Sequence, residues 1–215
     1  MRIGILGTGT LATALAAAWT RAGHQVTIGG RSPERAELAA AASGARARPL
    51  PQVGTDADAI LLSVHWAGVA DILEAAGAPA GSLAGKPLID PTNAVEHGIG
   101  VLRTQPGRAI AHHVADHAPG AHVVKALHLF PSSLWAAPDS SPPTVAMCGD
   151  DPQALELVGS LVRDLGGVPA VLGGLDRARQ LEEVAGFVIG LAFAGHDPQS
   201  AIPAVPAAAA GSTRP

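Results

Sequence analysis

A glycine-rich turn near the start of the chain constrains its fold more than any other feature. Residues 7–12 read G-T-G-T-L-A, between an apolar run at 2–6 and apolar positions at helical spacing over 11–22. The pattern G-x-G-x-x-A at such a junction is typical of the first strand-to-helix turn of a dinucleotide-binding domain. The glycine at the first position permits a tight turn, and the glycine at the third leaves room for a pyrophosphate. The alanine at the sixth position allows the helix to pack closely on the strand. The residues expected to hold the diphosphate are therefore Gly7, Thr8, Gly9, Thr10, Leu11 and Ala12.

The order of the remaining segments indicates an α/β protein. Apolar and β-branched runs alternate with segments of helical periodicity, which predicts a Rossmann-type, doubly wound and mainly parallel sheet with a small C-terminal helical extension. Continuous apolar runs such as A-I-L-L-S-V are expected of strands covered on both faces. We expect strands at 2–6, 26–29, 59–64, 88–90, 122–129, 143–148 and 168–172, and helices at 11–22, 33–42, 66–76, 152–165 and 175–194.

The middle and the end of the chain carry weaker patterns. Residues 91–120 contain prolines, glycines and four histidines with little periodicity, which predicts a loop-rich excursion. We expect an NADP-binding domain with an acceptor cleft over 1–172, a C-terminal helix over 173–200 and a flexible tail over 201–215. That helix is apolar on more than one face, which favours contact with a second subunit in a homodimer, although core packing explains the pattern equally well.

The residues after the second strand indicate which dinucleotide is bound. An NAD-binding domain usually has Asp or Glu there for the ribose 2′-hydroxyl, whereas residues 29–35 of this chain read G-G-R-S-P-E-R. Arg31 can pair with a 2′-phosphate, Ser32 can add its hydroxyl, and Arg35 lies one helical turn further on. We therefore predict NADP as the cofactor. In the alternative interpretation the two arginines are solvated surface charges, with Glu34 as a partner for either.

Composition and charge argue against several classes of protein. The net charge is −4, 47% of the residues are hydrophobic and 15% charged, which is typical of a soluble globular chain. Aromatic residues make up only 3%, and no basic stripe is present, so no nucleic-acid partner is expected. The single Cys148 suits a cytoplasmic protein, and the longest apolar helical run, at 184–195, is shorter than the about 20 residues of a membrane span.

Two other chemistries are weaker alternatives. His113 and His117 have the i,i+4 spacing that presents two imidazoles to a metal ion, but no Cys or acidic pattern beyond Asp116 completes a site. Ser132-Ser133 lacks the G-x-S-x-G elbow of a hydrolase. The sequence therefore predicts neither a bound metal nor acyl transfer.

Several motifs together resemble the NADPH-dependent coenzyme F420 reductases, also called F420H2:NADP oxidoreductases. Beyond the glycine turn, Gly23-His24 and the G-G-R-S-P-E-R segment, Ser63-Val64-His65-Trp66 lies where that family has a short segment after a strand. Residues 124–128 (V-K-A-L-H) are similar to its V-x-A-L-H strand, and residues 148–151 (C-G-D-D) to its C-G-D-D. Residues 172–175 with 179–182 resemble the entry to its last helix. The resemblance covers roughly residues 1–195.

The resemblance implies an activity and a set of site residues. In that family a hydride passes directly between the nicotinamide and a deazaflavin bound against it, so coenzyme F420 is the implied acceptor. Ser63, Val64 and His65 would then lie at the cofactor. His128 would help to place or polarise the deazaflavin, and residues 129–132 would line the cleft. A neutral imidazole there could donate a hydrogen bond to a flat cofactor, or it could protonate a developing anion near neutral pH.

Two alternatives keep NADP but change the activity. Residues 90–93 read D-P-T-N where the deazaflavin reductases are more apolar, and this segment resembles relatives of other substrate, which favours a different small acceptor. Gly174 also replaces the proline of the family's G-P-L. The third hypothesis is a protein that binds NADP without catalysing a reaction.

Overall fold

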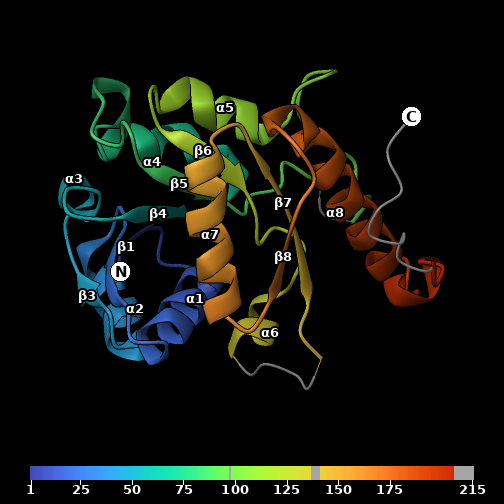
Figure 1. Cartoon of the computed structure of the whole chain (residues 1–215), viewed down its shortest axis with the longest axis horizontal. Coiled ribbons are helices and arrows are strands. Elements are labelled where there is room, and N and C mark those ends of the chain that lie inside the picture. Colours follow the sequence, from blue (N-terminus) through green and yellow to red (C-terminus); the bar gives the residue numbers. More distant parts are fainter. Residues whose placement is uncertain (97, 137–140, 206–215) are drawn as a thin grey trace.

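A computed structural model describes residues 1–96, 98–136 and 141–205, and these form one eight-stranded sheet with helices on both faces (Figure 1). The strand order is β3-β2-β1-β4-β5-β6-β7-β8, and neighbours are parallel except for β6 and β7. The predicted Rossmann-type α/β fold is confirmed. The strands are β1 (Arg2–Leu6), β2 (Gln25–Gly29), β3 (Arg46–Ala47), β4 (Ala59–Leu62), β5 (Pro87–Asp90), β6 (His122–Lys125), β7 (Thr144–Gly149) and β8 (Val168–Val171).

The helices connect these strands in the alternating order that the sequence predicts. Short 3-10 turns precede α4 and α8, where the sequence predicts continuous helices from 66 and from 175. The α-helices are α1 (Thr10–Arg21), α2 (Pro33–Ser43), α3 (Leu50–Val53), α4 (Val69–Ala75), α5 (Ile110–His117), α6 (Ser132–Ala136), α7 (Pro152–Asp164) and α8 (Ala178–Phe193). The 3-10 turns are η1 (Trp66–Gly68), η2 (Ala78–Ala80), η3 (Leu175–Arg177) and η4 (Pro198–Ala201).

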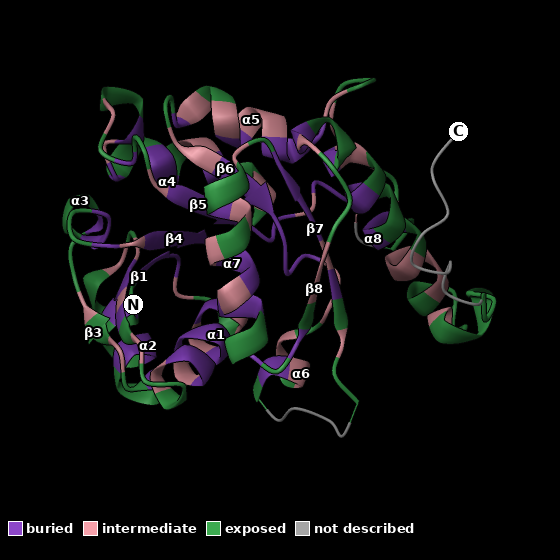
Figure 2. Cartoon of the chain, in the orientation of Figure 1, coloured by how far each residue is buried: buried purple, intermediate pink, exposed green. Residues whose placement is uncertain are grey.

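The central strands supply side chains to two hydrophobic clusters, one on each face of the sheet. In β1, Ile3 and Ile5 join the cluster under α1, α2 and α7, whereas Leu6 joins the cluster under α3, α4 and α5. Side chains alternate along a strand, so a strand that is apolar at every position is buried from both sides. Figure 2 shows this burial along β4, β5 and β6. The continuous apolar runs in the sequence therefore correspond to strands with a hydrophobic cluster on each face of the sheet.

Helix starts that have a local cap fall where the sequence predicts them. The Ser32 hydroxyl accepts a hydrogen bond from the Arg35 N–H at 3.2 Å, and Pro33 begins α2. The Asp151 carboxylate accepts one from the Ala154 N–H at 2.7 Å at the start of α7. Each cap satisfies a backbone N–H that has no partner within its helix.

Helix α5 lies inside the segment 91–120, for which the sequence predicts only loop. The N–H of Ala109, just before the helix, donates to His112 Nδ1 at 2.9 Å, but this local contact does not satisfy the next two N–H groups. Instead, the Glu182 carboxylate accepts hydrogen bonds from the N–H groups of Ile110 at 2.9 Å and Ala111 at 3.3 Å. This cap comes from α8, more than 70 residues later, so no local pattern could indicate it. The short elements β3, α3 and α6 were not predicted either.

The strand expected over 122–129 is wrong in its second half. Strand β6 ends at Lys125, and Leu127 adopts a left-handed backbone conformation with φ 61° that a strand does not allow. His128 therefore lies beyond the strand, on a bend. The following strand, β7, runs antiparallel to β6, so the sheet is mainly and not wholly parallel.

Helix α8 extends away from the sheet beyond its first turns (Figure 1). Val184 and Phe187 on this helix are 41% and 48% exposed. Contact with a second copy through this helix stays a prediction, as does the division into domains. In the described part of the chain no helix is long and apolar enough to cross a membrane. Residues 206–215 of the expected flexible tail lie outside the described residues.

We predict that two glycine-to-alanine changes in α8 affect stability in opposite directions. A Cβ at Gly186 would lie 2.3 Å from the Gly100 carbonyl oxygen, whereas the nearest atom to a Cβ at Gly190 is 3.5 Å away. Alanine is about 1 kcal/mol better than glycine inside a helix, and overpacking costs about 1–3 kcal/mol. Thermal unfolding should therefore show a higher Tm for Gly190→Ala and a lower Tm for Gly186→Ala. A higher Tm for both variants would contradict the packing of α8 against Gly100.

Candidate functional site

The glycine turn leads from β1 into α1 at the carboxyl edge of the parallel strands. Gly7 has φ 128°, donates its N–H to the Gly29 carbonyl at 2.8 Å, and leaves no room for a Cβ, which would lie 1.9 Å from the Ser63 carbonyl oxygen. The fold itself therefore requires glycine at position 7. Gly9 is different, because its φ of −79° is ordinary and a Cβ there would meet no atom within 4 Å. Packing does not explain that glycine, and room for a diphosphate does.

The N-terminus of α1 is open to an anion. The first hydrogen bond within the helix runs from the Thr13 N–H to the Gly9 carbonyl at 3.0 Å. The N–H groups of residues 10–12 come before it and therefore have no partner within the helix. No side chain caps this end, and the first turn has no acidic residue. Free N–H groups and the positive end of the helix dipole favour a phosphate there. Ala12 is fully buried, as the fingerprint requires for close packing.

Ser63, Val64 and His65 follow β4 and lie across the turn. The Ser63 N–H continues the sheet by donating to Leu6 O at 2.8 Å, and its carbonyl packs on Gly7. His65 begins the 3-10 turn η1, where its Nδ1 accepts the Ala67 N–H at 3.3 Å. The structure thus brings these predicted residues to the glycine turn, and the His65 ring has a local capping role of its own.

Arg31 lies just beyond the end of β2 with its guanidinium in solvent. Its Nη1 is 3.7 Å from the Asp71 carboxylate of α4, and the two side chains are 71% and 68% exposed. Glu34, the partner considered from the sequence, does not make this pair. Exposed pairs of this kind contribute about 0–1 kcal/mol, so a phosphate could displace Asp71 at little cost. A cavity of about 270 Å³ separates Arg31 from His65.

Sequence reasoning missed a buried ionic cluster at the ends of β5 and β6. The Lys125 ammonium lies 3.1 Å from the Asp90 carboxylate and 2.9 Å from the Glu182 carboxylate, and all three residues are 0% exposed. Lys125 also donates to the Thr92 carbonyl. A buried charge is stable only when it is paired and hydrogen-bonded, and here every member has both kinds of partner.

Each carboxylate of this cluster also holds a segment of backbone. Asp90 Oδ1 accepts the Thr92 N–H at 2.8 Å and the Thr92 hydroxyl at 2.5 Å. Glu182 accepts the first two N–H groups of α5, whose positive dipole end favours the carboxylate. The cluster thus joins the exits of β5 and β6 to α5 and α8. One signal was present in the sequence: Asp90 and Lys125 end adjacent apolar strands, and they are register partners.

His128 lies on the bend after β6, next to this cluster. Its backbone carbonyl accepts a hydrogen bond from the Asn93 side-chain N–H at 2.7 Å, and its ring is 8% exposed. Burial, and then the Lys125 charge, lower the pKa of His128 to about 3, although a backbone hydrogen bond with Leu181 acts in the opposite direction. The ring is therefore neutral near pH 7, which favours a hydrogen-bonding role over proton donation by an imidazolium.

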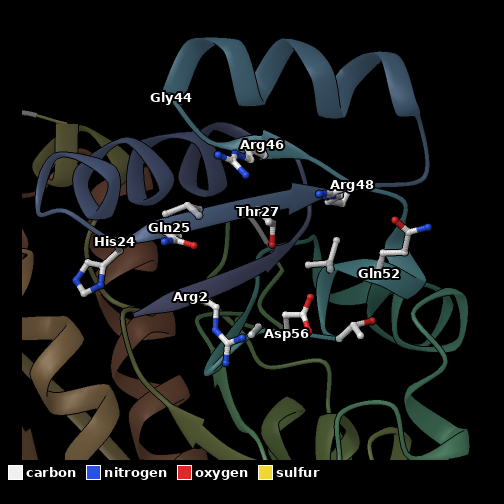
Figure 3. Close-up of a pocket in the computed structure, with 13 residues that line it drawn as sticks. Arg2, His24, Gln25, Thr27, Gly44, Arg46, Arg48, Gln52 and Asp56 are labelled. Atoms are coloured by element: carbon white, nitrogen blue, oxygen red, sulfur yellow. The ribbon is translucent and has the colours of Figure 1, made fainter.

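A cavity of about 550 Å³ lies elsewhere (Figure 3). It is lined by Arg2, Arg46 and Arg48 among others, beside the strands β2 and β3 and the single turn of α3. None of the predicted site residues lines it.

His113, His117 and Cys148 have the following surroundings in the structure. His117 Nδ1 lies 2.8 Å from the His113 carbonyl, and among the described residues no three His, Cys, Asp or Glu side chains gather to hold a metal ion. Burial raises the pKa of Cys148 to about 12, which keeps this thiol protonated and unreactive.

Known proteins resemble this chain over most of its length. Residues 2–94 match the family described as NADP oxidoreductase, coenzyme F420-dependent. A solved structure from Arthrobacter sp. FB24, a candidate F420-dependent NADP reductase, has 26% identity and a TM-score of 0.79 over 91% of this chain and 96% of that chain. Protein SMa0349 from Sinorhizobium meliloti has 28% identity and a TM-score of 0.72 over 81% of this chain and 85% of that chain.

A curated relative extends the likeness to a longer protein. Metalloreductase STEAP3 of Rattus norvegicus is 29% identical over 192 residues, which cover 85% of this chain. The chain spans only 36% of the length of that relative.

The fold, the glycine turn and the comparisons together define a Rossmann-type dinucleotide-binding domain that is similar to those of NADP oxidoreductases. Within that class, the match over residues 2–94 confirms the predicted resemblance to the coenzyme F420-dependent NADP oxidoreductases.

We predict that Glu182 and Glu183, which are neighbours on α8, contribute very differently to the free energy of unfolding. Glu182→Gln removes one partner of the buried Lys125 and should lower the free energy of unfolding by about 3 kcal/mol. Glu183 pairs with Arg179 at the surface, at 2.8 Å with the side chains 54% and 31% exposed. Glu183→Gln should therefore cost about 0.5 kcal/mol or less. Urea unfolding of both variants measures the difference, and equal losses would contradict the cluster.

Proposed function

We propose that the protein transfers a hydride between NADP(H) and the deazaflavin coenzyme F420. NADPH would supply the hydride from its dihydronicotinamide ring, and the residues of this chain would bind and align the two partners. The observation that carries the proposal is that Gly9, a glycine that packing does not need, lies at the open N-terminus of α1. The family description and the name of the Arthrobacter protein support F420 as the partner.

The dinucleotide would extend along the carboxyl edge of the strands. The amides of Thr10, Leu11 and Ala12 would bind the diphosphate, since they are the N–H groups that the helix leaves unused. Arg31 would pair with the 2′-phosphate in place of Asp71. Ser32 and Arg35 at the start of α2 would add polar groups nearby. The adenosine part would then lie over β2, and the nicotinamide toward β5 and β6.

His128 would lie where the nicotinamide and its partner meet. Hydride transfer depends on alignment of the two rings more than on acid–base catalysis, which suits a histidine that is neutral and buried. The segment 129–132, expected to line the cleft, leads from His128 into α6, and half-buried Phe130 packs edge-on against Trp135 with ring centroids 5.9 Å apart. A cleft wall built on such a ring contact would be stiff.

A reductase of another small acceptor is the second candidate. It is favoured by the D-P-T-N segment and by the name metalloreductase of the rat relative. Asp90 and Thr92 of that segment are engaged in the buried cluster, however, which leaves Asn93 as its residue with an unpartnered polar atom.

The test is anaerobic mixing of the purified protein with NADPH and oxidised coenzyme F420. We expect catalytic loss of the visible F420 absorbance together with oxidation of NADPH. A ferric chelate in place of F420 tests the second candidate, and a protein-free sample controls for direct reaction. NADPH oxidation with the ferric chelate alone would replace the first proposal by the second. Tight NADPH binding without oxidation by either acceptor would leave a non-catalytic NADP-binding protein.

A further inference from the structure

Asn93 and His128 each keep one buried polar atom without a hydrogen-bond partner among the residues that the structure describes. These atoms are Asn93 Oδ1 and His128 Nδ1. The two residues are joined, because Asn93 Nδ2 donates to the His128 carbonyl at 2.7 Å. Leaving a buried acceptor unpaired costs about 1–3 kcal/mol, so such atoms are uncommon in folded proteins and often serve a ligand.

Both atoms are hydrogen-bond acceptors. The Asn93 atom is a carbonyl oxygen by its chemistry. The His128 ring makes a backbone hydrogen bond with Leu181 that favours its protonated form, so the ring donates in that bond. Since Nδ1 has no partner, Nε2 is the donor. A neutral imidazole has a single N–H, which leaves Nδ1 bare.

The buried cluster holds this pair in place. Asn93 follows directly after Thr92, whose N–H and hydroxyl are bound by Asp90 and whose carbonyl is bound by Lys125. His128 follows the left-handed Leu127, three residues after Lys125. Both side chains therefore leave the same anchored edge of the sheet, at the exits of adjacent strands. Acceptors that are fixed before a ligand arrives lose little entropy on binding it.

We propose that Asn93 Oδ1 and His128 Nδ1 accept the two N–H groups of the nicotinamide carboxamide of NADP(H). The inference rests on the NADP binding proposed above and names two residues that orient its reacting ring. A primary amide offers two N–H donors on one nitrogen, which matches two acceptors, whereas a ketone or an ester offers none. Because the carboxamide is attached to the ring, holding it would set which part of the ring faces the hydride acceptor.

The experiment compares NADP⁺ with 3-acetylpyridine adenine dinucleotide phosphate, in which a methyl group replaces the carboxamide nitrogen. Calorimetry on the wild-type protein should show NADP⁺ bound at least about tenfold more tightly, since the analogue leaves buried acceptors unpaired. In Asn93→Leu this preference should fall to about threefold or less, because only His128 remains to accept. Asn93→Asp keeps an acceptor oxygen at the position and should retain most of the preference.

A fragment without the nicotinamide ring serves as the control for folding and for NADP binding. The fragment 2′-phospho-ADP-ribose should bind wild-type protein and both Asn93 variants equally. If the wild-type protein binds NADP⁺ and the acetylpyridine analogue equally, or if Asn93→Leu keeps the full preference, the carboxamide proposal is wrong while NADP binding stands. If the wild-type protein binds neither NADP⁺ nor the fragment, the proposed function itself fails.

Discussion

The Lys125 ammonium, buried between the carboxylates of Asp90 and Glu182, makes the interaction on which the part of the molecule around β5, β6, α5 and α8 depends. It ties the exits of β5 and β6 to α8, and through Glu182 it caps α5. Removing any member would leave charge buried without a partner, which proteins tolerate poorly. The loop after β5 and the bend before His128 are therefore held by one set of contacts, even though they are more than 30 residues apart.

The two halves of the carboxyl edge are built on different principles. Around β1 and β2, backbone groups carry the chemistry: a glycine turn, the free amides of α1 and one exposed arginine. Around β5 and β6, the polar groups belong to buried side chains, which the ionic cluster holds in position. The first arrangement suits a dinucleotide shared by many reductases. In the proposed function, the second arrangement would select the acceptor. In it the D-P-T-N segment packs into the protein, with Asp90 fully buried and Asn93 half-buried.

What could be predicted from the sequence was decided by how local each interaction is. The turn at 7–12 and the caps at Ser32 and Asp151 act over a few residues, so patterns revealed them. Helix α5 depends on a cap from Glu182 in addition to the contact of His112 in its own first turn, and the bend at Leu127 depends on packing, so the local sequence indicated neither clearly. The family resemblance singled out His128 but put it on a strand that in fact ends at Lys125, and the neutral state of its ring follows only from its burial and from Lys125. Asp71, which faces Arg31, lies on an element that no spacing rule connects to β2.

We propose that NADP binds at the carboxyl edge of β1 and β2, with Arg31 on its 2′-phosphate. The most direct measurement is the pair of dissociation constants for NADPH and NADH, in wild-type protein, in Arg31→Ala and in Arg46→Ala, an exposed arginine of the separate cavity. We expect NADPH to bind at least about tenfold more tightly than NADH, because a phosphate–arginine bond contributes about 1.5–3 kcal/mol. Arg31→Ala should remove most of this preference, and Arg46→Ala should keep it. Equal affinities of the wild-type protein for NADPH and NADH would contradict the account.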